Sequence, residues 1–459
     1  MRTLALLLVL GACTKMQDDD CCLAGDTDTD TDTDTDTDTE PDCASITTFE
    51  DGQSPTRFLY VDAAGDDRSG DGSAGAPFAS VEQAVRDATP GTAIRVRPGT
   101  YSANYVDGLR GRADAPIWIG GEPGQARPVF ADAGEGIHLT RVSHVILHDV
   151  EVRDTRANGI NIDDGGETSN PLATHHVIVR NVDVHDIGGS GNQDCIKLSG
   201  LYDYWVLDST IARCGGGNSG SGVDHVGCHR GVIGRNLIQQ TSGSAVQVKG
   251  GSTDVDVRWN HIIDPGQRGI NMGGSTGFEF FRPPLTEAGD NSEASRVRVL
   301  GNLFEGGLAP LAFVGCVDCE ASHNTIIDPE RWVMRILQET RSTETYAFAT
   351  ARDGVLRNNL VVLDRGTISR WVNVGDGTEP DSFQVTNDLW YARDAPTERP
   401  DPPGVLTGFI VGQDPGLDAN FVPSSTGPAA GAGVATPLKG DRNGACYADP
   451  PTLGSVEVR

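Results

Sequence analysis

The chain between Asn236 and Val362 repeats one short unit, a polar residue followed by two or three apolar β-forming residues. It reads Asn236-Leu237-Ile238, Asn260-His261-Ile262-Ile263, Asn302-Leu303-Phe304, Asn324-Thr325-Ile326-Ile327 and Asn359-Leu360-Val361-Val362. Related units start upstream at Asp149, Asn181 and Ser209, and successive units start 22 to 42 residues apart. A minimum period lengthened by Gly-rich insertions is typical of a solenoid in which each repeat forms one coil.

A second family of short strands precedes most of these units. Its members are Gly136-Ile137-His138-Leu139, Gly159-Ile160-Asn161-Ile162, Cys195-Ile196-Lys197-Leu198, Asp224-His225-Val226, Val246-Gln247-Val248 and Ile270-Asn271-Met272. Alternation with period 2 turns Ile, Leu and Val inward and the polar residues outward. We expect the repeated Asn to lie at a bend, because it tolerates left-handed backbone angles and its amide can bond to the coils on both sides. The pattern predicts an all-β fold, a parallel β-helix (solenoid) over residues 46–365.

The two ends of such a core must be covered. Residues 80–88 predict an N-terminal capping helix, because Ser80 and Gln83 form a capping box and Pro90-Gly91 ends the helix. Residues 366–459 are predicted to form further coils and a loop-rich C-terminal capping segment.

The opening of the body contains Phe58-Leu59-Tyr60-Val61-Asp62, Ala76-Pro77-Phe78, the helix, and Ile94 to Tyr101. Its close contains residues 427–433, 441–446 and 453–457. Both ends resemble secreted β-helix proteins of the pectate-lyase-like superfamily, and the resemblance covers about 400 residues. It implies a right-handed parallel β-helix. It does not imply one reaction, since the superfamily holds lyases, hydrolases, epimerases and non-catalytic surface proteins.

Outward residues on neighbouring coils should stack into a polar stripe, and long polymers bind such stripes. The predicted substrate-binding stripe consists of Asn161, Lys197, His225 or Asp224, Gln247 and Asn271, with Asp163 and Lys249 two residues further along their strands. The alternative is a solvated face, because any β-helix exposes polar residues.

The stretch from Val246 to Ser252 resembles the lysine strand of the chondroitinase B and alginate lyase family. This implies that Lys249 is a catalytic base that removes the proton next to a uronate carboxyl. The chain departs from the family pattern twice. Ser242 and Ser244 stand where the family has calcium-binding glutamates, and Gly273 stands near the place of its arginine, for which Arg268 is a displaced substitute.

A rival set of candidates is acidic. Asp163 or Asp164, Asp194 and Asp224 lie on three successive coils. They resemble both the calcium cluster of a pectate lyase and the acid pair of a polygalacturonase-like hydrolase. Asp194 and Asp224 are therefore candidate catalytic residues, and Asp163 and Asp164 are candidate calcium ligands. Turn-forming aspartates are the alternative.

The longest insertion, residues 274–295, directly follows the stripe strand at Asn271. A loop of this length is usually functional. The insertion contains Phe278, Phe280 and Phe281, whose rings can offer a sugar a flat apolar face, and Phe281 is the candidate among them. We expect Arg282 to bind a carboxylate or sulfate. Packing of the loop over the core by its own Phe residues is the alternative. His175-His176 are interpreted as turn surface.

The first residues predict export. Residues 1–12 have the basic start, short apolar run and small residues of a signal peptide, and Leu10-Gly11-Ala12-Cys13 resembles the bacterial lipobox. This implies lipidation of Cys13 and a membrane partner. Residues 13–45 form an acidic Asp/Thr-rich stalk that cannot bury a core. We expect a protein anchored at the bacterial cell envelope, at the outer membrane or cell surface.

The formal net charge of −29 disfavours nucleic acid as a partner. An exported chain with ten cysteines can form disulfides, although their connectivity cannot be deduced from spacing. Cys316 and Cys319 resemble half of a zinc site, but no second pair follows them.

Two functions follow from these features. The first is a surface-tethered enzyme that acts on an acidic polysaccharide as a lyase or hydrolase, with calcium as its candidate cofactor. The second is a non-catalytic β-helix lipoprotein that binds carbohydrate or builds the cell surface.

The lipobox generates the first prediction. Cys13→Ala should release the protein from the membrane fraction, because the lipid is attached through that sulfur. The measurement is a comparison of membrane and soluble fractions by immunoblot, with Cys21→Ala as a matched control that should stay anchored. Retention of Cys13→Ala in the membrane would contradict the lipoprotein assignment.

Overall fold

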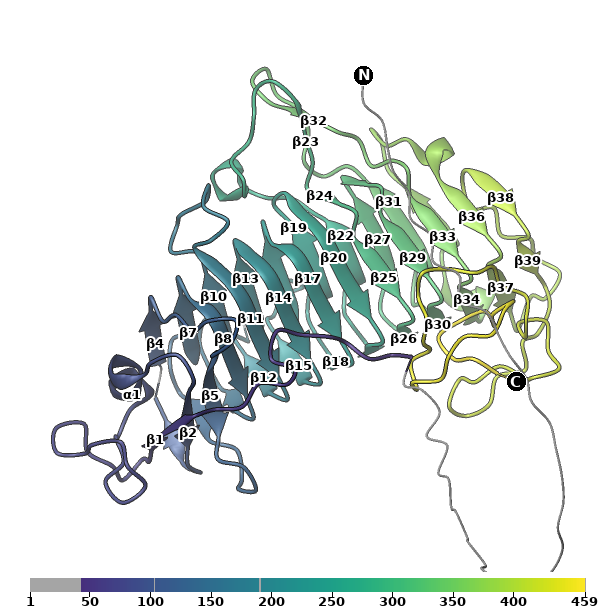
Figure 1. Cartoon of the computed structure of the whole chain (residues 1–459). Helices are drawn as coiled ribbons and strands as arrows, with labels where there is room; N and C mark the ends of the chain where they lie inside the picture. Colours follow the sequence, from purple (N-terminus) through teal and green to yellow (C-terminus); the bar gives the residue numbers. More distant parts are fainter. Residues whose placement is uncertain (1–42, 103, 190, 459) are drawn as a thin grey trace, which may run out of the picture. The chain divides into compact units, whose positions relative to one another are not determined.

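The computed structural model describes residues 43–102, 104–189 and 191–458. The predictions for the signal peptide, Cys13 and most of the stalk lie outside these residues. Within them, three parallel sheets wind around a solenoid (Figure 1). Each full coil gives one strand to each sheet in turn, as Ile137–Thr140 (β7), Ser143–His148 (β8) and Glu151–Arg153 (β9) do.

Sheet 1 has ten strands. They are β4 (Asn104–Asp107), β7, β10 (Ile160–Asp163), β13 (Ile196–Ser199), β16 (Val223–Val226), β19 (Ser244–Lys249), β22 (Arg268–Gly273), β27 (Leu311–Val314), β31 (Met334–Leu337) and β35 (Val372–Val374). All six strands of the predicted second strand family are present, and all of them lie in sheet 1.

Sheet 2 has fifteen strands. They are β1 (Arg57–Val61), β2 (Thr92–Val96), β5 (Ile117–Gly121), β8, β11 (Thr174–Arg180), β14 (Leu201–Leu207), β17 (His229–Gly234), β20 (Ser252–Arg258), β24 (Ala294–Ser295), β25 (Arg298–Leu300), β28 (Cys316–Val317), β29 (Glu320–Ser322), β33 (Val355–Arg357), β36 (Gln384–Thr386) and β38 (Val405–Thr407).

Sheet 3 has twelve strands and carries the repeat that starts at Asn236. They are β3 (Thr100–Tyr101), β6 (Val129–Ala131), β9, β12 (Asp183–Ile187), β15 (Thr210–Cys214), β18 (Leu237–Gln239), β21 (His261–Ile263), β26 (Leu303–Glu305), β30 (Thr325–Ile327), β34 (Leu360–Leu363), β37 (Leu389–Ala392) and β39 (Ile410–Val411). The coils therefore continue past residue 365, to Val411.

The core is built from identical positions on successive coils. In sheet 1 the strand register stacks Ile137, Ile160, Ile196, Val223, Val246, Ile270, Leu311 and Met334. All of these side chains are buried. Burying each one stabilises the fold by about 1.5–3 kcal/mol before the entropy of ordering the chain is subtracted.

The repeated asparagines form a buried ladder, the Asn ladder, of Asn236, Asn260, Asn302, Asn324 and Asn359. The Asn260 Nδ2 donates to Asn302 Oδ1 at 2.9 Å, and the Asn302 Nδ2 donates to Asn324 Oδ1 at 3.0 Å. The backbone N–H of each of these residues donates to the same acceptor as its amide. The predicted bonding along the stack is confirmed.

The predicted left-handed angle lies elsewhere. The residue with positive φ is the one before each ladder position, as in Arg235, Trp259 and His323. Asp149 and Asn181 also have positive φ, so they correspond to the residue before a ladder position. The first two repeat units predicted from the sequence therefore start one residue too early. The ladder asparagine instead supplies an acceptor and donors to backbone groups that the bend leaves unpaired.

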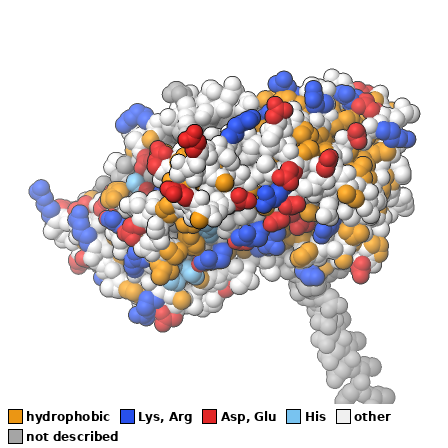
Figure 2. Space-filling model, turned by 90° about the horizontal axis from the view of Figure 1, so that it is seen from above, with side chains coloured by type: hydrophobic (Ala, Val, Ile, Leu, Met, Phe, Trp, Pro, Cys, Tyr) orange, Lys and Arg blue, Asp and Glu red, His pale blue; other side chains and the backbone are white. Residues whose placement is uncertain are grey.

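Residues with left-handed backbone angles also stack near the start of the sheet 2 strands. They have no paired residue in the strand register, which continues on either side of them. We call this set the first bend column: His144, His176, Asp203, Arg230, Asp254, Arg296, Asp318 and Asp353. Arg230 forks onto Asp203, with both bonds at 2.6 Å, and Arg296 forks onto Asp254 at 2.7 and 2.8 Å. Figure 2 shows that acidic and basic side chains are intermixed on one face of the molecule.

One α-helix occurs in the described residues, α1 (Val81–Asp87), with Ser80 as its N-cap. The Ser80 Oγ accepts from the Gln83 backbone N–H at 3.2 Å, whereas the Gln83 side chain binds Arg86 instead of closing the box. Among the described residues, no helix is long and apolar enough to cross a membrane. Short 3-10 turns lie at Phe278–Phe280, Arg365–Thr367 and Pro380–Ser382.

The described chain begins as a strap, residues 43–56, that runs back along the solenoid from its C-terminal end to β1 (Figure 1). Cys43 is joined to Cys446 by a disulfide, and Ala44 packs with Trp259 and Leu438. Residues 43–45, predicted as stalk, thus belong to the folded body. Residues 412–458 contain no helix or strand and pack through Ala429 and Leu453 on the outer face of sheet 3.

Two further disulfides, Cys195–Cys214 and Cys316–Cys319, complete the pairs in the described residues, and Cys228 is free and buried. The resemblance of Cys316 and Cys319 to half of a zinc site does not hold in this structure, because their sulfurs are joined to each other.

The Asn ladder generates the second prediction. Asn302→Ala removes the acceptor for Asn260 and the donor to the Val257 carbonyl, so it should lower the free energy of unfolding by about 1–3 kcal/mol for each buried group left unpaired. Chemical denaturation followed by circular dichroism measures the change. The exposed Asn420 is the control, since Asn420→Ala should stay within about 0.5 kcal/mol of the wild type. Equal stability of the two variants would contradict a structural role for the ladder.

Candidate functional site

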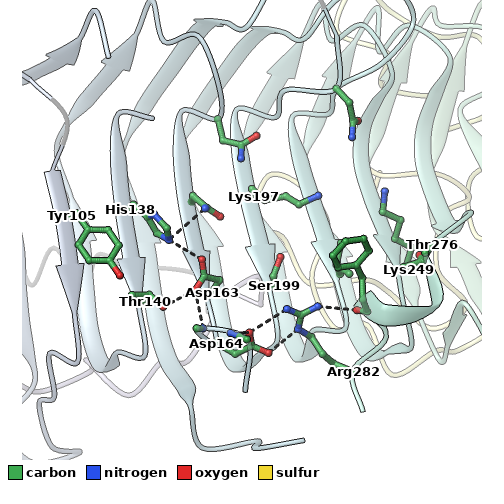
Figure 3. A pocket seen from close by; sticks show the side chains of 18 of the residues that line it. Tyr105, His138, Thr140, Asp163, Asp164, Lys197, Ser199, Lys249, Thr276 and Arg282 are labelled. Atoms are coloured by element: carbon green, nitrogen blue, oxygen red, sulfur yellow. Dashed lines mark hydrogen bonds and ion pairs between the residues drawn. The ribbon is translucent and has the colours of Figure 1, made fainter. Parts of the chain in front are cut away.

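The outer face of sheet 1 carries two stacked columns of side chains, all of them polar except Val226 (Figure 3). The first column is Tyr105, His138, Asn161, Lys197, Asp224, Gln247 and Asn271. The second is Asp107, Thr140, Asp163, Ser199, Val226 and Lys249. The predicted stripe is therefore a real alignment of side chains on successive coils.

Two clefts lie end to end over these columns. The first, of about 610 Å³, is lined by residues from Tyr105 and His138 to Lys249, and the second, of about 540 Å³, by residues from Ser221 and Gln247 to Glu339. Asn192, Lys249 and Ser275 line both clefts, so the two form one continuous groove. A groove that follows the coil axis fits a linear chain better than a compact small molecule.

The insertion 274–295 forms one wall of this groove. Glu293 is buried and accepts bonds from Thr276 N and Oγ1 at 2.9 and 2.7 Å, which fixes the start of the loop. A parallel pair, β23 (Asp290–Asn291) with β32 (Ala347–Phe348), ties its end to a second loop. Both ends of the insertion are therefore fixed by hydrogen bonds.

The aromatic assignment within the loop was wrong. Phe281 is only 2% exposed and packs edge-on against Phe348 at 5.6 Å, so it holds the loop down. Phe280, 52% exposed, lines the groove in its place. The sequence does not say which of the two neighbouring rings, Phe280 or Phe281, packs inward.

Arg282 lines the first cleft, but its guanidinium is already engaged. It forks onto Asp164, with Nε–Oδ2 at 2.7 Å and Nη2–Oδ1 at 3.1 Å, and donates to the Phe280 carbonyl at 2.8 Å. The carboxylate that Arg282 binds therefore belongs to this chain, and the pair positions Phe280 at the cleft edge.

Asp163 is held by a different set of donors. Its carboxylate bonds to His138 Nε2 at 2.7 Å, Thr140 Oγ1 at 2.6 Å and the Gly165 N–H at 2.8 Å. Glu135 approaches the other ring nitrogen of His138 at 3.1 Å. Hydrogen bonds to Asp163 and Glu135 raise the pKa of His138 to about 9, so its ring is a cation at neutral pH.

These contacts test the predicted calcium ligands. A calcium ion takes six to eight oxygens, several of them carboxylate oxygens without competing donors. The Asp163 oxygens are occupied by His138 and Thr140, and the Asp164 oxygens by Arg282. The side chains of Asp163 and Asp164 do not fit a calcium site in this arrangement.

The centre of the groove holds four charged groups, which we call the lysine–carboxylate cluster: Asp194, Lys197, Asp224 and Lys249. Lys197 Nζ makes an ion pair with Asp224 and lies 3.4 Å from Asp194 Oδ2. Lys249 Nζ lies 3.5 Å from Asp224 Oδ1. Figure 3 shows the two lysines projecting from separate strands into the same part of the cleft.

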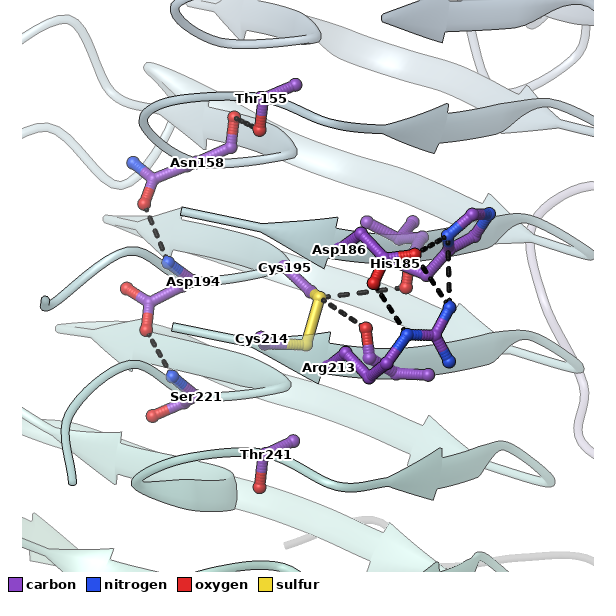
Figure 4. The surroundings of a disulfide bond; sticks show 12 residues. Thr155, Asn158, His185, Asp186, Asp194, Cys195, Arg213, Cys214, Ser221 and Thr241 are labelled. Carbon is purple, nitrogen blue, oxygen red and sulfur yellow. Dashed lines mark hydrogen bonds and ion pairs between the residues drawn. A yellow bond between two sulfur atoms is a disulfide. The ribbon is translucent and has the colours of Figure 1, made fainter. Parts of the chain in front are cut away.

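The two carboxylates of the cluster are buried beneath the lysines. Asp194 is 1% and Asp224 0% exposed, and neither lines either cleft. The Ser221 N–H donates to Asp194 Oδ1 at 2.7 Å, and the Asp194 N–H donates to Asn158 Oδ1, beside the Cys195–Cys214 disulfide (Figure 4). Both aspartates, predicted to be catalytic, contact the lysines and line neither cleft.

The charges of the two lysines separate the pKa values of the two buried acids. Burial and the charge of Asp224 raise the pKa of Asp194 to about 7, whereas Lys197 and Lys249 outweigh burial and hold the pKa of Asp224 below its ordinary value. Against the opposing effect of burial, Asp224 and Asp194 raise the pKa of Lys197. Lys197 therefore stays protonated across the physiological range.

The remaining predicted residues divide into two groups. Asn161 lines the first cleft, and Gln247, Arg268 and Asn271 line the second. Arg268 donates to Asn271 Oδ1 at 3.0 Å and pairs with Glu339. His225 does not belong here: its register partners are the inward Leu198 and Val248, and it is 0% exposed. Its placement in the stripe was wrong, and Asp224 holds that position in the column.

Sequence reasoning missed several groove residues. Tyr105 and His138 continue the first column by two coils, and extension of the same alternation upstream predicts them. Asn192, Thr276 and Glu339 reach the groove from loops, whose course no periodic pattern fixes.

Comparisons with known proteins agree with this fold. A family model described as the right handed beta helix region matches residues 135–326, which span the coils of the groove. Among solved structures, the pectate lyase Pel9A superposes with a TM-score of 0.53 at 16% identity, covering 91% of this chain and all of that one. The chain therefore has a right-handed parallel β-helix fold.

Two other solved structures show weaker similarity. An alginate lyase from Paenibacillus sp. str. FPU-7 has a TM-score of 0.44 at 16% identity, covering 77% of this chain and 98% of that one. A GH136 lacto-N-biosidase from Eubacterium ramulus has a TM-score of 0.44 at 14% identity, covering 76% and 66%. No curated protein sequence matches the chain.

The contacts of His138 generate the third prediction. Its ring should titrate in the folded protein with a pKa near 9, and Asp163→Asn should move that pKa down toward the ordinary 6.5. Because the pKa is raised by folding, the pairing stabilises the protein fully below about pH 6.5, and this contribution is lost as pH rises through about 9. NMR titration of the ring protons measures both values.

The exposed bend residue Asp254 provides the control, since its carboxylate pairs with Arg296 and not with His138. Asp254→Asn should leave the titration of His138 unchanged. A wild-type pKa near 6.5 would show that the bonds to Asp163 and Glu135 do not form in solution.

Proposed function

We propose that the groove binds an acidic polysaccharide and cleaves it by β-elimination at a uronate residue, with Lys249 as the base and Lys197 as the cation that binds the uronate carboxylate. The observation that carries the proposal is the choice and placement of lysine. The sequence has 36 basic residues, of which only four are lysines: Lys15, Lys197, Lys249 and Lys439. Two of the four meet at the centre of the groove.

Arginine and lysine differ in the chemistry that they allow. Arginine stays protonated in proteins, whereas a lysine amine can lose its proton and act as a base. At its bends this chain uses arginine as the fixed cation, in the pairs Arg213–Asp186, Arg230–Asp203 and Arg235–Asp208. A lysine at the groove centre instead allows a reversible proton at Lys249, the proposed base.

The two lysines have different surroundings, which suit different roles. Lys197 is clamped between Asp224 and Asp194, so it stays charged and can lie against a substrate carboxylate. A cation there stabilises the charge that develops on the uronate when its α-proton is removed. Lys249 has the looser contact, 3.5 Å to Asp224, and lines both clefts. It is the better placed of the two to take that proton.

The remaining groups explain how a chain would be held. Phe280 offers an exposed ring at the edge of the first cleft, and rings of this kind bind the apolar face of a sugar. Asn161, Gln247 and Asn271 add amides along the first column for hydroxyl groups. In the elimination Lys249 takes the proton, and the electron pair that it leaves forms the carbon–carbon double bond. The bond to the glycosidic oxygen breaks, and that oxygen takes up a proton from solvent to become the hydroxyl of the released chain, so no water is added overall.

The location of the reaction is part of the proposal. Lipidation at Cys13 and the acidic residues that follow it would hold the enzyme at the bacterial cell envelope. Three disulfides in the described residues support an oxidising compartment outside the cytosol.

A second candidate function is binding without catalysis. His138, Arg282 and Arg268 each pair with a carboxylate of this chain, so most of the charge in the groove is already neutralised. Such a surface suits recognition through hydrogen bonds. Hydrolysis by an acid pair has less support, because Asp194 and Asp224 do not reach either cleft.

Substitution of the two lysines tests the proposal and provides the fourth prediction. The assay follows the ultraviolet absorbance of unsaturated sugars over pectate, alginate and glycosaminoglycans, with and without added calcium. Lys249→Arg should lower turnover by about 10²–10⁴-fold, because it keeps the charge and removes the base. Lys197→Arg keeps the cation that this role requires and should retain measurable turnover.

Lys439→Ala is the matched control, since Lys439 is exposed and lines neither cleft. It should behave as the wild type. Full activity of Lys249→Arg would exclude Lys249 as the base. Glycan binding without any turnover, lost on substitution of Gln247 and Lys249, would favour the binding function.

A further inference from the structure

We infer that His144, His175 and His176 form a binding site for a divalent transition metal of the zinc type, outside the groove. None of the three lines either cleft. The sequence interpretation of His175-His176 as plain turn surface did not foresee this cluster, because its third member lies on another coil, 31 residues upstream.

The backbone explains why the side chains meet. His144 on β8 and His176 on β11 are both left-handed residues of the first bend column, each with φ 52°. The register pairs Ser143 with His175 and Val145 with Val177, so the two skipped residues project at the same point of adjacent coils. His175, next to the skipped residue, turns its ring toward both.

The rings converge with their nitrogens close together. The His144 and His176 rings stack with centroids 4.6 Å apart and 21° between their planes, and His175 stands edge-on to both at 5.3 and 5.1 Å. One nitrogen of each ring lies within 4.8 Å of those of the other two, and His175 Nδ1 is 2.9 Å from His176 Nδ1. Zinc–nitrogen bonds of about 2.0–2.1 Å in a tetrahedron place the donor atoms about 3.4 Å apart, within reach of small ring rotations.

Packing alone does not account for this set of residues. Phe49 stands edge-on to His144 at 5.5 Å and to His176 at 5.8 Å, so the strap covers part of the cluster. Apolar rings would serve that packing equally well. Figure 2 shows histidine side chains next to apolar ones on the surface.

The rest of the first bend column adds an independent comparison. Its next two coil pairs place an aspartate beside an arginine, Asp203 with Arg230 and Asp254 with Arg296. At His144 and His176 the column instead places two like groups together, with no acid between them. Two neutral histidines side by side are favourable when their rings bind the same cation.

The state of the rings agrees with this use. Burial and the neighbouring rings of His176 and His175 lower the pKa of His144 to about 4, and burial lowers the pKa values of His175 and His176. Neutral imidazole is the form that binds metals.

The surrounding charges define the kind of metal. The only carboxylate near the rings in the described residues is Asp203, 3.9 Å from His176 Nδ1 and already paired with Arg230. Arg110 lies close by and donates to Ser143 Oγ at 3.3 Å. A site of three nitrogen ligands with little oxygen suits Zn²⁺, Ni²⁺ or Cu²⁺. It does not suit Ca²⁺ or Mg²⁺, which bind oxygen ligands. The metal would join β8 to β11 and stabilise the first coils.

The experiment uses the full-length mature protein, freed of metal with a chelator and titrated with Zn²⁺ by calorimetry. We expect one tight site whose affinity falls by more than about 100-fold in His176→Ala and in His175→Ala, since loss of even an outer partner weakens metal binding about 10- to 100-fold. Zn²⁺ should raise the unfolding temperature of the wild type and not of these variants. This is the fifth prediction.

His261→Ala is the matched control, because His261 is a part-exposed histidine that pairs with Glu305 alone. It should keep the tight site, whereas weak binding by acidic residues should be common to all the proteins. Replacement of Zn²⁺ by Co²⁺ gives a visible spectrum whose loss in His144→Gln reports the third ligand in a folded protein. Absence of a tight site in the wild type, or the same affinity in His176→Ala, would overturn the inference.

Discussion

Hydrogen bonding between parallel coils requires every side chain to lie about 4.8 Å from its counterparts on the coils above and below. Each position along the solenoid must therefore be filled by residues that tolerate stacking on one another. Aliphatic residues meet this requirement inside the solenoid, as in the column from Ile137 to Met334. The Asn ladder meets it with amides that donate and accept at once. The bends meet it with aspartate and arginine on adjacent coils, as in Asp203 with Arg230 and Asp208 with Arg235.

The same requirement forms the groove. Asn161, Lys197, Asp224 and Gln247 come from coils separated by loops of different length, yet the register places them in one line. Stacking a lysine on an aspartate in the half-buried centre brings opposite charges together. The charges of Lys197 and Lys249 then hold the pKa of Asp224 low, while burial and the charge of Asp224 raise that of Asp194. The chemistry proposed for the groove is thus a product of neighbouring coils, and no single strand contains it.

The sequence was sufficient to predict what depends on period and alternation. The strand families, the Asn ladder and the stripe of Asn161, Lys197, Gln247 and Asn271 all rest on such patterns. It failed where two adjacent residues have similar character. Asp224 and His225 are both polar, and Phe280 and Phe281 are both aromatic, so alternation gives no choice between inner and outer faces. Contacts made by loops, such as Arg282 with Asp164, depend on the path of a non-repeating segment and leave no periodic signal.

The strap has a mechanical consequence. Cys43, where the folded body begins, is covalently joined to Cys446 in the last segment of the chain, and the strap then crosses the solenoid to reach β1. Tension applied to the body through its N-terminal side enters at the disulfide and is shared with the C-terminal segment. It does not act first on the strand hydrogen bonds of β1. A protein held by its N-terminus against shear would therefore resist being unwound coil by coil from that end, since the load enters where two distant parts of the chain are joined.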